Sequence, residues 1–389
     1  MPTRLRAGLA TAAATTALLA TLGMSPASAA PLPKIDKSMP VPASTRLAID
    51  AAAADFLANS LDKTPAVWVA VWDPAQGYFE QAYGKAVVPG TAASVADHLR
   101  IGSITKTVFA TAVLQAVAAG RLSLTATVQD LDPQLARAFP KVARYTVAQL
   151  LGMRTRIPDY ADAAVAAMAS NPQRRFTSRD LISLAFEKGK KIPAQGGYST
   201  TNYIILGEVM QHVTGKTPAD LVNGVFRQAG MSQSRLIPGS RPMPEPAAHG
   251  YLGTLGTTEL AAVNPGLEAS TDVGLWPLDW GREGGGAYST IGDLATWGGT
   301  CLGNTLLAKS IVGQRLRANS IDAGLYGLGI TRQGDWLAHS GQVLGFTSNV
   351  ACNAKTGAVV AYVTNSTYGT IDLMSSLGVA LAPDYVNAS

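Results

Sequence analysis

Apolar residues recur at every third or fourth position from 46 to 61, and this spacing is typical of a surface helix. Residues 66–72 then form a β-branched and aromatic run, and 73–77 supply turn formers such as Pro and Gly. Alternation of apolar and polar residues resumes over 78–83. The pattern predicts a helix followed by a β-hairpin.

A second helix is predicted to begin at Ser103, because residues 104–117 are apolar on nearly every side. Such a helix is expected to be buried. Residues 121–245 are mainly helical in pattern, with Pro and Gly breaks. Strand patterns return at 325–332, 336–343, 347–352 and 358–364, with a turn at 353–357 and a final helix at 373–382. Strands at both ends with helices between them predict a mixed α/β (α+β) fold.

The first residues have the pattern of an export signal. Arg4 and Arg6 precede an apolar stretch over 9–22, and the small residues 27–29 follow as a cleavage site. We therefore expect residues 1–29 to be removed near Ala29 and the mature chain, 30–389, to be secreted. The apolar stretch is too short for a membrane anchor, so no integral membrane segment is expected in the mature chain.

The charge, the cysteines and the histidines of the chain limit its partners and cofactors. Without residues 1–29 the chain has 29 basic and 26 acidic residues, a net charge of +3, so nucleic-acid binding is not expected. Cys301 and Cys352 are predicted to form a disulfide in an oxidising compartment, and two buried thiols are the alternative. The four histidines lie far apart in the sequence, and no metal or other cofactor is expected.

Ser103 and Lys106 place a hydroxyl and an amine on the same side of the predicted buried helix. Unpaired N–H groups at the helix start favour negative charge on Ser103. A poorly hydrated Lys106 can accept the serine proton or stabilise the alkoxide. The same Ser-x-x-Lys spacing occurs at Ser60 and Lys63, but that copy precedes a strand and predicts a surface turn.

These residues belong to a segment, 99–106, that resembles the active-site segment of the serine β-lactamase/penicillin-binding superfamily. The rest of the mature chain is similar to one branch of this superfamily, which contains class C β-lactamases, D-alanyl-D-alanine carboxypeptidases and related esterases. Further similar segments follow in order along nearly the whole mature chain, at 120–124, 157–160, 197–203, 285–290, 326–329 and 339–346.

The resemblance implies that Tyr198 is the second catalytic residue, a phenol that transfers protons next to Lys106. A cationic neighbour is expected to favour its phenolate. Thr200 stands where the family has Asn, so its contact with a substrate carbonyl is in doubt. Asn202, two residues later, is a second candidate for that contact.

For the third motif, His339-Ser340-Gly341 is expected to contact substrate from a strand beside the cleft. The backbone N–H groups of Ser103 and Gln342 would form the oxyanion hole. Residues 355–357, the literal Lys-Thr-Gly, fall between two apolar runs and predict a hairpin turn instead.

The resemblance also implies an α/β lobe with an antiparallel sheet flanked by helices, at about 46–118 and 250–389, and an all-helical lobe at about 119–249. It implies a secreted D-alanyl-D-alanine carboxypeptidase-like hydrolase with a Ser103 acyl-enzyme. The expected substrates are small peptides, β-lactams or esters, including peptidoglycan stem peptides. A carboxylesterase or weak β-lactamase is an alternative. Because Thr200 departs from the Asn of the family, a catalytically weakened cell-wall peptide-binding protein is a further alternative.

Overall fold

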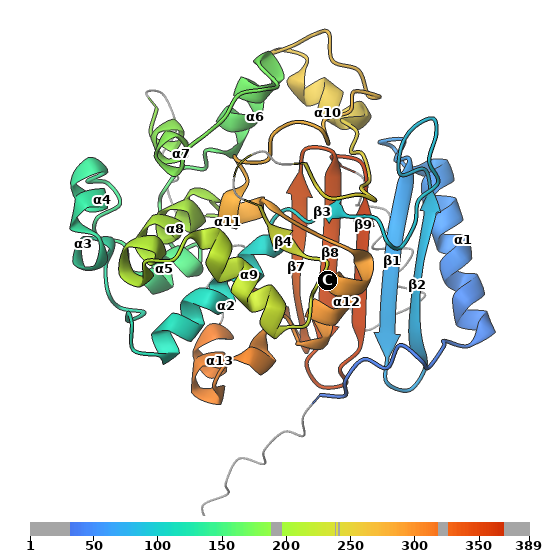
Figure 1. The fold of residues 1–389 in the computed structure, drawn as a ribbon, viewed down its shortest axis with the longest axis horizontal. Coiled ribbons are helices and arrows are strands. Elements are labelled where there is room, and N and C mark those ends of the chain that lie inside the picture. Colours follow the sequence, from blue (N-terminus) through green and yellow to red (C-terminus); the bar gives the residue numbers. More distant parts are fainter. Residues whose placement is uncertain (1–31, 188–196, 238, 240–241, 318–325, 369–389) are drawn as a thin grey trace, which may run out of the picture. The chain divides into compact units, whose positions relative to one another are not determined.

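Six antiparallel strands form the main sheet of the structure, a computed structural model that describes residues 32–187, 197–237, 239, 242–317 and 326–368 (Figure 1). The strand order is β2-β1-β9-β8-β7-β6. The six strands are β1 (Ala66–Asp73), β2 (Gly77–Gly84), β6 (Thr331–Gln333), β7 (Trp336–Val343), β8 (Phe346–Asn353) and β9 (Val359–Thr364). The mixed α/β class predicted from the sequence is therefore confirmed.

β1 lies inside this sheet, paired with β2 on one side and with β9 on the other. Successive side chains of a strand point to opposite faces. Val67 and Val69 therefore contribute to one hydrophobic core, and Trp68 and Ala70 contribute to the other. Burial on both faces explains why the sequence shows a continuous apolar run here instead of alternation.

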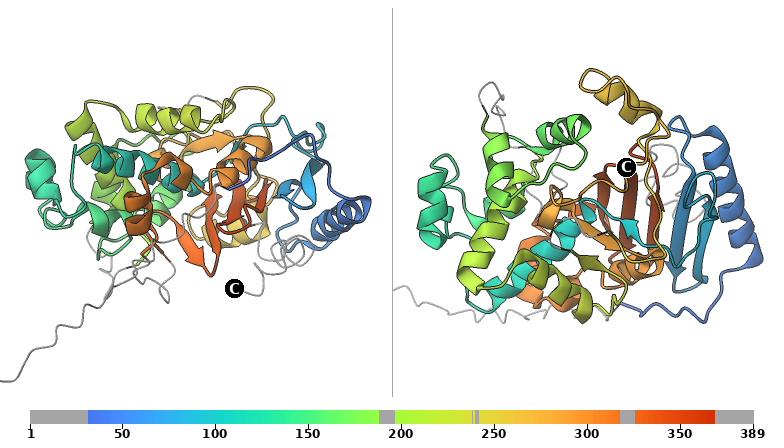
Figure 2. Two further views of the ribbon diagram at one scale, coloured as in Figure 1. Left: turned by 90° about the horizontal axis from the view of Figure 1, so that it is seen from below. Right: turned by 45° about the horizontal axis from the view of Figure 1, so that its top comes forward.

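Helices cover both faces of the sheet. On one face, α1 (Ala43–Asn59) contributes Ile49 and Phe56 to the core that contains Val67, and Figures 1 and 2 show this helix beside β1 and β2. On the other face, α12 (Ile291–Gly299) contacts β1, β8 and β9. The helix that begins after Ser103, α2 (Ile104–Ala118), packs against β7 and β8.

A disulfide joins Cys301 to Cys352, with the two Cα atoms 5.6 Å apart. Cys301 follows α12, and Cys352 lies in β8. The bond therefore fixes the end of a covering helix to the sheet below it. The predicted pairing of the two cysteines is confirmed.

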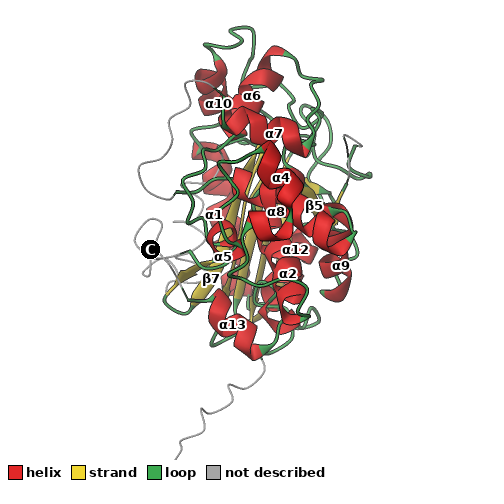
Figure 3. Ribbon diagram, turned by 90° about the vertical axis from the view of Figure 1, so that its left-hand side faces the viewer, coloured by secondary structure: helices red, strands yellow, loops and turns green. Residues whose placement is uncertain are grey.

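The middle of the sequence is mainly helical, as predicted. Its helices are α3 (Val128–Leu131), α4 (Pro133–Ala138), α5 (Val147–Leu151), α6 (Ala161–Ser170), α7 (Ser178–Ala185), α8 (Thr201–Thr214) and α9 (Pro218–Gln228). In Figure 3, α4 and α8 stand in front of the strands. The later helices are α10 (Gly253–Leu260), α11 (Arg282–Gly285), α13 (Lys309–Arg315) and the 3-10 helix Asn304–Leu306.

A second, three-stranded sheet leads the chain toward α2. It has the order β3 (Leu99–Arg100), β5 (Ala287–Ser289), β4 (Arg235–Leu236), and all pairs are antiparallel. β3 ends at Arg100, three residues before Ser103. The segment preceding Ser103 is thus held by backbone pairing with a strand that lies almost two hundred residues later.

One predicted strand is wrong in extent. The pattern over 325–332 predicts a strand, but β6 begins only at Thr331. Gly327 donates to the Ile330 carbonyl at 2.7 Å, and Gly329 has φ of +73°. This tight turn, with a residue in the left-handed region, interrupts extended structure before β6.

Several predictions lie outside the described residues, namely the signal segment 1–29 and the final helix 373–382. The division into lobes at 46–118, 119–249 and 250–389 stays a prediction. Within the described part of the chain, no helix has the length and apolar character needed to cross a membrane.

Candidate active site

Ser103 stands at the start of α2, where the chain turns sharply out of β3. Gly102 makes this turn with φ of +49°, which glycine adopts without steric cost. Ser103 is the N-cap residue, and no described residue accepts a hydrogen bond from its backbone N–H. This N–H is thus available to a negatively charged oxygen at the helix start.

β7 packs directly against this turn. A Cβ added to Gly102 would lie 2.7 Å from the backbone nitrogen of Gln342, and one added to Gly341 would lie 2.1 Å from the Ile101 carbonyl oxygen. Two glycines therefore allow a contact between backbones that any other residue would block. The contact brings the Gln342 backbone to Gly102, the residue before Ser103, where the sequence predicts an oxyanion hole.

Lys106, one turn into α2, is fully buried, and its amine is surrounded by oxygen atoms. Its Nζ lies 2.8 Å from Ser103 Oγ, 3.3 Å from Thr200 Oγ1 and 2.7 Å from the Gly284 carbonyl oxygen. Burial lowers the pKa of Lys106 to about 7, and the nearby charge of Asp159 acts in the opposite direction. Burial thus brings the neutral form of Lys106 within reach at neutral pH.

Tyr198 lies beside the serine–lysine pair. The Lys106 Nζ is 4.9 Å from the centre of the Tyr198 ring, and the Tyr198 hydroxyl lies near Ser103. The residue as a whole is 42% exposed. Burial of the hydroxyl raises the pKa of Tyr198 well above its usual range. The expectation of a Tyr198 phenolate is therefore corrected, because the phenol keeps its proton near neutral pH.

His339 lies behind Tyr198 rather than in contact with the serine. Its ring centre is 6.3 Å from that of Tyr198, and its Nε2 lies 3.0 Å from the Tyr326 hydroxyl. Burial and the nearby charge of Lys106 lower the pKa of His339 to about 3, so the ring is neutral. Nδ1 faces the Ser340 carbonyl oxygen at 2.6 Å and must carry the single proton, which leaves Nε2 to accept from Tyr326.

Thr200 and Asn202, the two candidates for the substrate contact that an Asn makes in the family, lie in different places. Thr200 faces Lys106 and lines the pocket next to Ser103. Asn202 is fully buried; its Oδ1 accepts from Thr155 at 2.7 Å, and its Nδ2 faces the Met153 sulfur. The structure does not bring Asn202 to the cleft, so a substrate contact by this residue is not supported.

Sequence reasoning missed two groups that hold the site together. Asp159 accepts from the Thr200 backbone N–H at 2.9 Å and is the acidic group that raises the pKa of Lys106 against burial. The Gly284 carbonyl, in α11, fixes the Lys106 amine. Asp159 lies in a segment similar to the family, which was a usable signal. A backbone carbonyl has no signature in the sequence.

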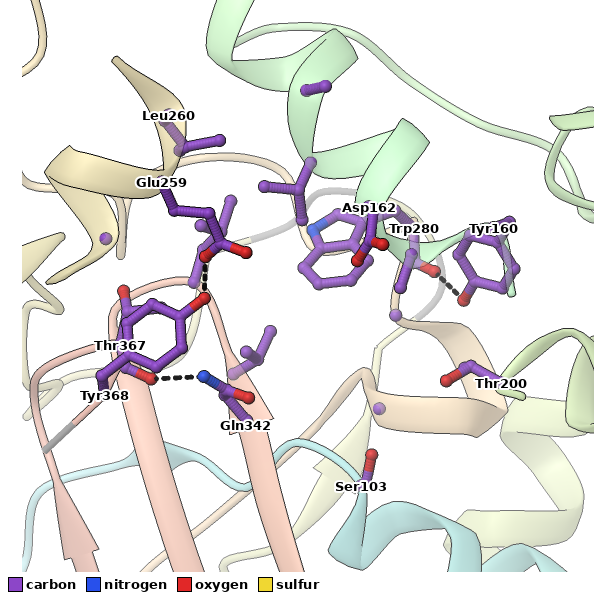
Figure 4. Close-up of a pocket in the computed structure, with 18 of the residues that line it drawn as sticks. Ser103, Tyr160, Asp162, Thr200, Glu259, Leu260, Trp280, Gln342, Thr367 and Tyr368 are labelled. Carbon is purple, nitrogen blue, oxygen red and sulfur yellow. Dashed lines mark hydrogen bonds between the residues drawn. The ribbon is translucent and has the colours of Figure 1, made fainter. Parts of the chain in front are cut away.

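A pocket of about 320 Å³ opens beside Ser103 (Figure 4). Thr200, Gln342 and residues of α6, α10 and α11 also line it. Much of the wall is apolar, with contributions from Val165, Leu252, Leu260, Val263 and Val343. The described residues that line this pocket include no Lys, Arg or His.

The look-alike motifs are placed elsewhere. Ser60 and Lys63 lie in the turn after α1, and residues 355–357 form the β8–β9 hairpin turn, with Gly357 at φ of +83°. Lys355 there pairs with Asp335 at 2.8 Å. Among the described residues, no group of three or more His, Cys, Asp or Glu side chains is arranged to hold a metal ion.

Comparison with known proteins gives a family match and a curated relative. A model of the Beta-lactamase family matches residues 53–378. The chain is 30% identical over 173 residues to penicillin-binding protein 4 of Amycolatopsis lactamdurans. That match covers 43% of this chain and 43% of the relative, so the chain aligns with less than half of the relative's length.

Solved structures with a similar fold cover most of the chain. A D-stereospecific amidohydrolase from Streptomyces sp. has a TM-score of 0.70 and 24% identity, covering 87% of this chain and 98% of the other. The D-amino acid amidase from Ochrobactrum anthropi SV3 with D-phenylalanine has a TM-score of 0.73 and 21% identity, covering 89% and 100%. A penicillin-binding protein from Bacillus halodurans has a TM-score of 0.68 and 22% identity, covering 85% and 98%.

Proposed function

The chain belongs to the beta-lactamase family, and from this premise we propose that it is a secreted serine hydrolase that cleaves amide bonds after D-amino acids, as a D-alanyl-D-alanine carboxypeptidase-like enzyme. The acyl group would be carried by Ser103. The proposal covers both the substrate and secretion. The pattern of residues 1–29 supports secretion.

The observation that carries the proposal is the environment of the Lys106 amine. A neutral lysine has two N–H bonds and one lone pair. The Gly284 carbonyl and the Thr200 hydroxyl oxygen accept the two N–H groups, at 2.7 and 3.3 Å. The lone pair is then directed at Ser103 Oγ, 2.8 Å away. Thr200 is in this arrangement a positioning residue for the lysine.

Acylation follows from this arrangement. The Ser103 proton passes to Lys106 while a bond forms between Ser103 Oγ and the carbonyl carbon of the substrate. The carbonyl oxygen becomes negatively charged and accepts from the backbone N–H groups of Ser103 and Gln342. When the C–N bond breaks, the leaving nitrogen takes a proton from Tyr198, which Lys106 reprotonates.

Deacylation uses the same groups in reverse order. Water loses a proton to the neutral Lys106–Tyr198 pair and attacks the ester carbon, and Ser103 recovers its proton as the acid leaves. Loss of one donor of an oxyanion hole typically costs about 100- to 1,000-fold in rate. The close approach at Gly102 and Gly341 is therefore as important to the proposal as the side chains.

One observation favours a second candidate, hydrolysis of D-amino acid amides; the structural neighbours include a D-stereospecific amidohydrolase and a D-amino acid amidase. A D-Ala-D-Ala peptide brings a terminal carboxylate on its leaving group. The described residues lining the pocket include no cation to receive it, and His339 is neutral. An amide with an uncharged leaving group has no such requirement.

The experiment compares two substrates that differ in one group. Acetyl-D-Ala-D-Ala and its C-terminal carboxamide have the same scissile bond, and only the first carries the carboxylate. Hydrolysis is followed for both, for a p-nitrophenyl ester and for a chromogenic cephalosporin. Ser103→Ala is the control, and acetyl-L-Ala-D-Ala tests the stereochemistry.

A higher kcat/KM for the free carboxylate supports the carboxypeptidase-like function, and an equal or higher value for the carboxamide supports the amidase. Turnover of the ester or cephalosporin alone would assign a carboxylesterase or a weak β-lactamase instead. Acylation of Ser103 without turnover, seen by peptide mass mapping, would assign a binding protein. Hydrolysis that survives in Ser103→Ala would contradict the nucleophile.

A further inference from the structure

Arg315, the last residue of α13, is a buried cation that packs against α2. The residue is fully buried, and burial lowers its pKa only to about 10, so the guanidinium stays charged near neutral pH. Among the described residues, no Asp or Glu forms an ion pair with it. A buried charge without an acidic partner is costly, so the position of Arg315 in the core points to a specific role.

Oxygen atoms from three segments of the chain surround the guanidinium. Nη1 donates to the Leu302 carbonyl oxygen at 3.0 Å and to Asn304 Oδ1 at 3.1 Å. Nη2 donates to the Thr107 carbonyl oxygen at 3.2 Å, and Nε donates to the Leu328 carbonyl oxygen at 3.3 Å. The five N–H groups of an arginine suit such a set of acceptors. Arg315 thus joins two later segments of the chain to α2.

One of these segments is the turn before β6, residues 326–330. Besides accepting from the arginine side chain, Leu328 donates its backbone N–H to the Arg315 carbonyl oxygen at 3.0 Å. On its other side the turn lies against α2, because a Cβ added to Gly329 would lie 2.4 Å from the Ala110 Cβ. The turn is therefore packed closely between Arg315 and the helix that carries the catalytic lysine.

The turn presents Tyr326 to the active site. Its ring lies edge-on to the Tyr198 ring, with the ring centres 6.1 Å apart, and its hydroxyl lies 3.0 Å from His339 Nε2. An edge-on ring pair contributes about 0.5–1.5 kcal/mol and has a defined geometry, so Tyr326 limits where the Tyr198 ring can lie. Burial, Lys106 and also Arg315 lower the pKa of His339, which leaves its Nε2 to accept from Tyr326.

We propose that Arg315 is a positioning residue for acylation: it fixes the turn that carries Tyr326 to α2, and Tyr326 then holds Tyr198 beside the serine–lysine pair. Arg315 contacts no reacting atom in this arrangement and acts through Tyr326. The inference rests on the proposed function, because Tyr198 is the group that protonates the leaving nitrogen in that reaction. Displacement of Tyr198 should therefore slow only those substrates whose leaving group needs the proton.

The test compares two substrates with the same acyl group, the p-nitroanilide and the p-nitrophenyl ester of N-acetyl-D-alanine. The anilide nitrogen must be protonated as it leaves, whereas p-nitrophenolate leaves without a proton. Arg315→Met should lower the anilide-to-ester ratio of single-turnover acylation rates about 10- to 100-fold, since a displacement of about 1 Å can cost about 100-fold. Substrate affinity should change little. Arg315→Lys, which keeps the charge and some of the donors, should give an intermediate ratio.

Two further variants separate positioning from a general loss of stability. Tyr326→Ala should lower the same ratio, and adding Arg315→Met to it should lower the ratio by less than about threefold more, because both changes act on Tyr198 by one route. Phe56→Ala removes a core side chain on the opposite face of the sheet from α2. It should cost about 3–5 kcal/mol of stability and keep the wild-type ratio. The ratio is unaffected by the amount of folded protein.

Failure of this inference and failure of the proposed function give different results. A wild-type ratio in both Arg315 variants, or an equal fall in Phe56→Ala, would overturn the positioning role and leave the hydrolase intact. Additive effects of Arg315→Met and Tyr326→Ala would overturn the route through Tyr326. Arg315→Lys decides alone if Arg315→Met does not fold. No acylation of the wild type by either substrate, together with an unlabelled Ser103, would overturn the proposed function and this inference with it.

Discussion

At the scale of single residues, burial favours the neutral form of both Lys106 and Tyr198. Both side chains are less charged than they are in water, since a poorly hydrated site penalises the ammonium and the phenolate alike. The lysine becomes a base near neutral pH and the tyrosine remains a proton donor. Tyr198 can thus give its proton to the leaving nitrogen while Lys106 returns one to it, so a free phenolate need not form.

The first prediction concerns pH. Acylation of Ser103 requires neutral Lys106, whose pKa is lowered to about 7. The acylation rate should fall about tenfold per pH unit below 7 and reach a plateau above it. Labelling of Ser103 by an uncharged fluorophosphonate from pH 5 to 9 measures this. A rate that does not change between pH 6 and 9 would exclude Lys106 as the base.

The second prediction concerns Tyr198→Phe. The variant keeps the ring that packs near Tyr326 and His339 but loses the proton donor, so acylation should slow by about 100- to 10,000-fold, with little change in affinity. Single-turnover acylation measures rate and affinity separately. A residue that only packs would show a change of less than a few-fold, and Tyr198 would then leave the mechanism.

The sequence allowed Ser103, Lys106 and Tyr198 to be proposed because their side chains carry the chemistry and form motifs. It did not indicate the charge state of Tyr198, which depends on the burial of its hydroxyl. It also left Asn202 open as an alternative to Thr200 for the contact with the substrate carbonyl. Their side chains separate only when the start of α8 is placed, since one faces Lys106 and the other faces Thr155.

At the scale of elements, the site depends on a close approach between β7 and the turn before α2. Hydrogen bonding of Ser348 Oγ to the Ile101 carbonyl, at 2.9 Å, adds a link between β8 and the same turn. The turn is therefore held by the sheet on one side and by β5 on the other. Rigid support of this kind keeps the two oxyanion donors in place.

The third prediction follows for Gly341→Ala. The new Cβ would lie 2.1 Å from the Ile101 carbonyl oxygen and 2.4 Å from Ser348 Oγ, so β7 must shift away from Ser103. Acylation should slow by about 100-fold or more, the effect of losing one oxyanion donor. Gly313→Ala, where an added Cβ meets nothing within 4 Å, is the control and should retain full activity. Comparable acylation in the two variants would contradict the assigned oxyanion hole.

Elements with a clear period or a clear turn were predicted well. The β1–β2 hairpin and the β7–β8–β9 meander have β-branched runs between turn residues, and α2 has an apolar run on all sides. β3, β4 and β5 were not predicted, because strands of two or three residues show no period. They depend on pairing with partners far away in the sequence.

At the scale of the whole molecule, the fourth prediction concerns the disulfide. Cys301 and Cys352 are 51 residues apart, and closing such a loop stabilises the folded state by roughly 4 kcal/mol in the chain-entropy account. Cys301→Ala/Cys352→Ala should lower the free energy of unfolding by up to that amount. Denaturant titration measures it, with reduced wild-type protein as the matched comparison. Two free thiols in the intact mass of non-reduced protein would refute the bond.

The pocket could not be predicted from the sequence. Its walls come from α6, α10, α11 and β7, which are separated by long stretches of chain. Asp162, Glu259 and Trp280 belong to no motif, and nothing in their local patterns brings them together. The reaction was therefore easier to infer than the substrate, because the catalytic groups are encoded locally and the pocket is encoded by the tertiary fold.

The order of the strands also sets when the enzyme can become active during its own synthesis. β9 occupies the place between β1 and β8, with Val67 opposite Thr364, so the six-stranded sheet closes only after β9 has left the ribosome. Ser103 is made early and the Gln342 backbone late. A chain stopped before β7 carries its nucleophile without the second oxyanion donor. On the proposed mechanism, the oxyanion hole is therefore complete only after β7 has packed against the turn before Ser103.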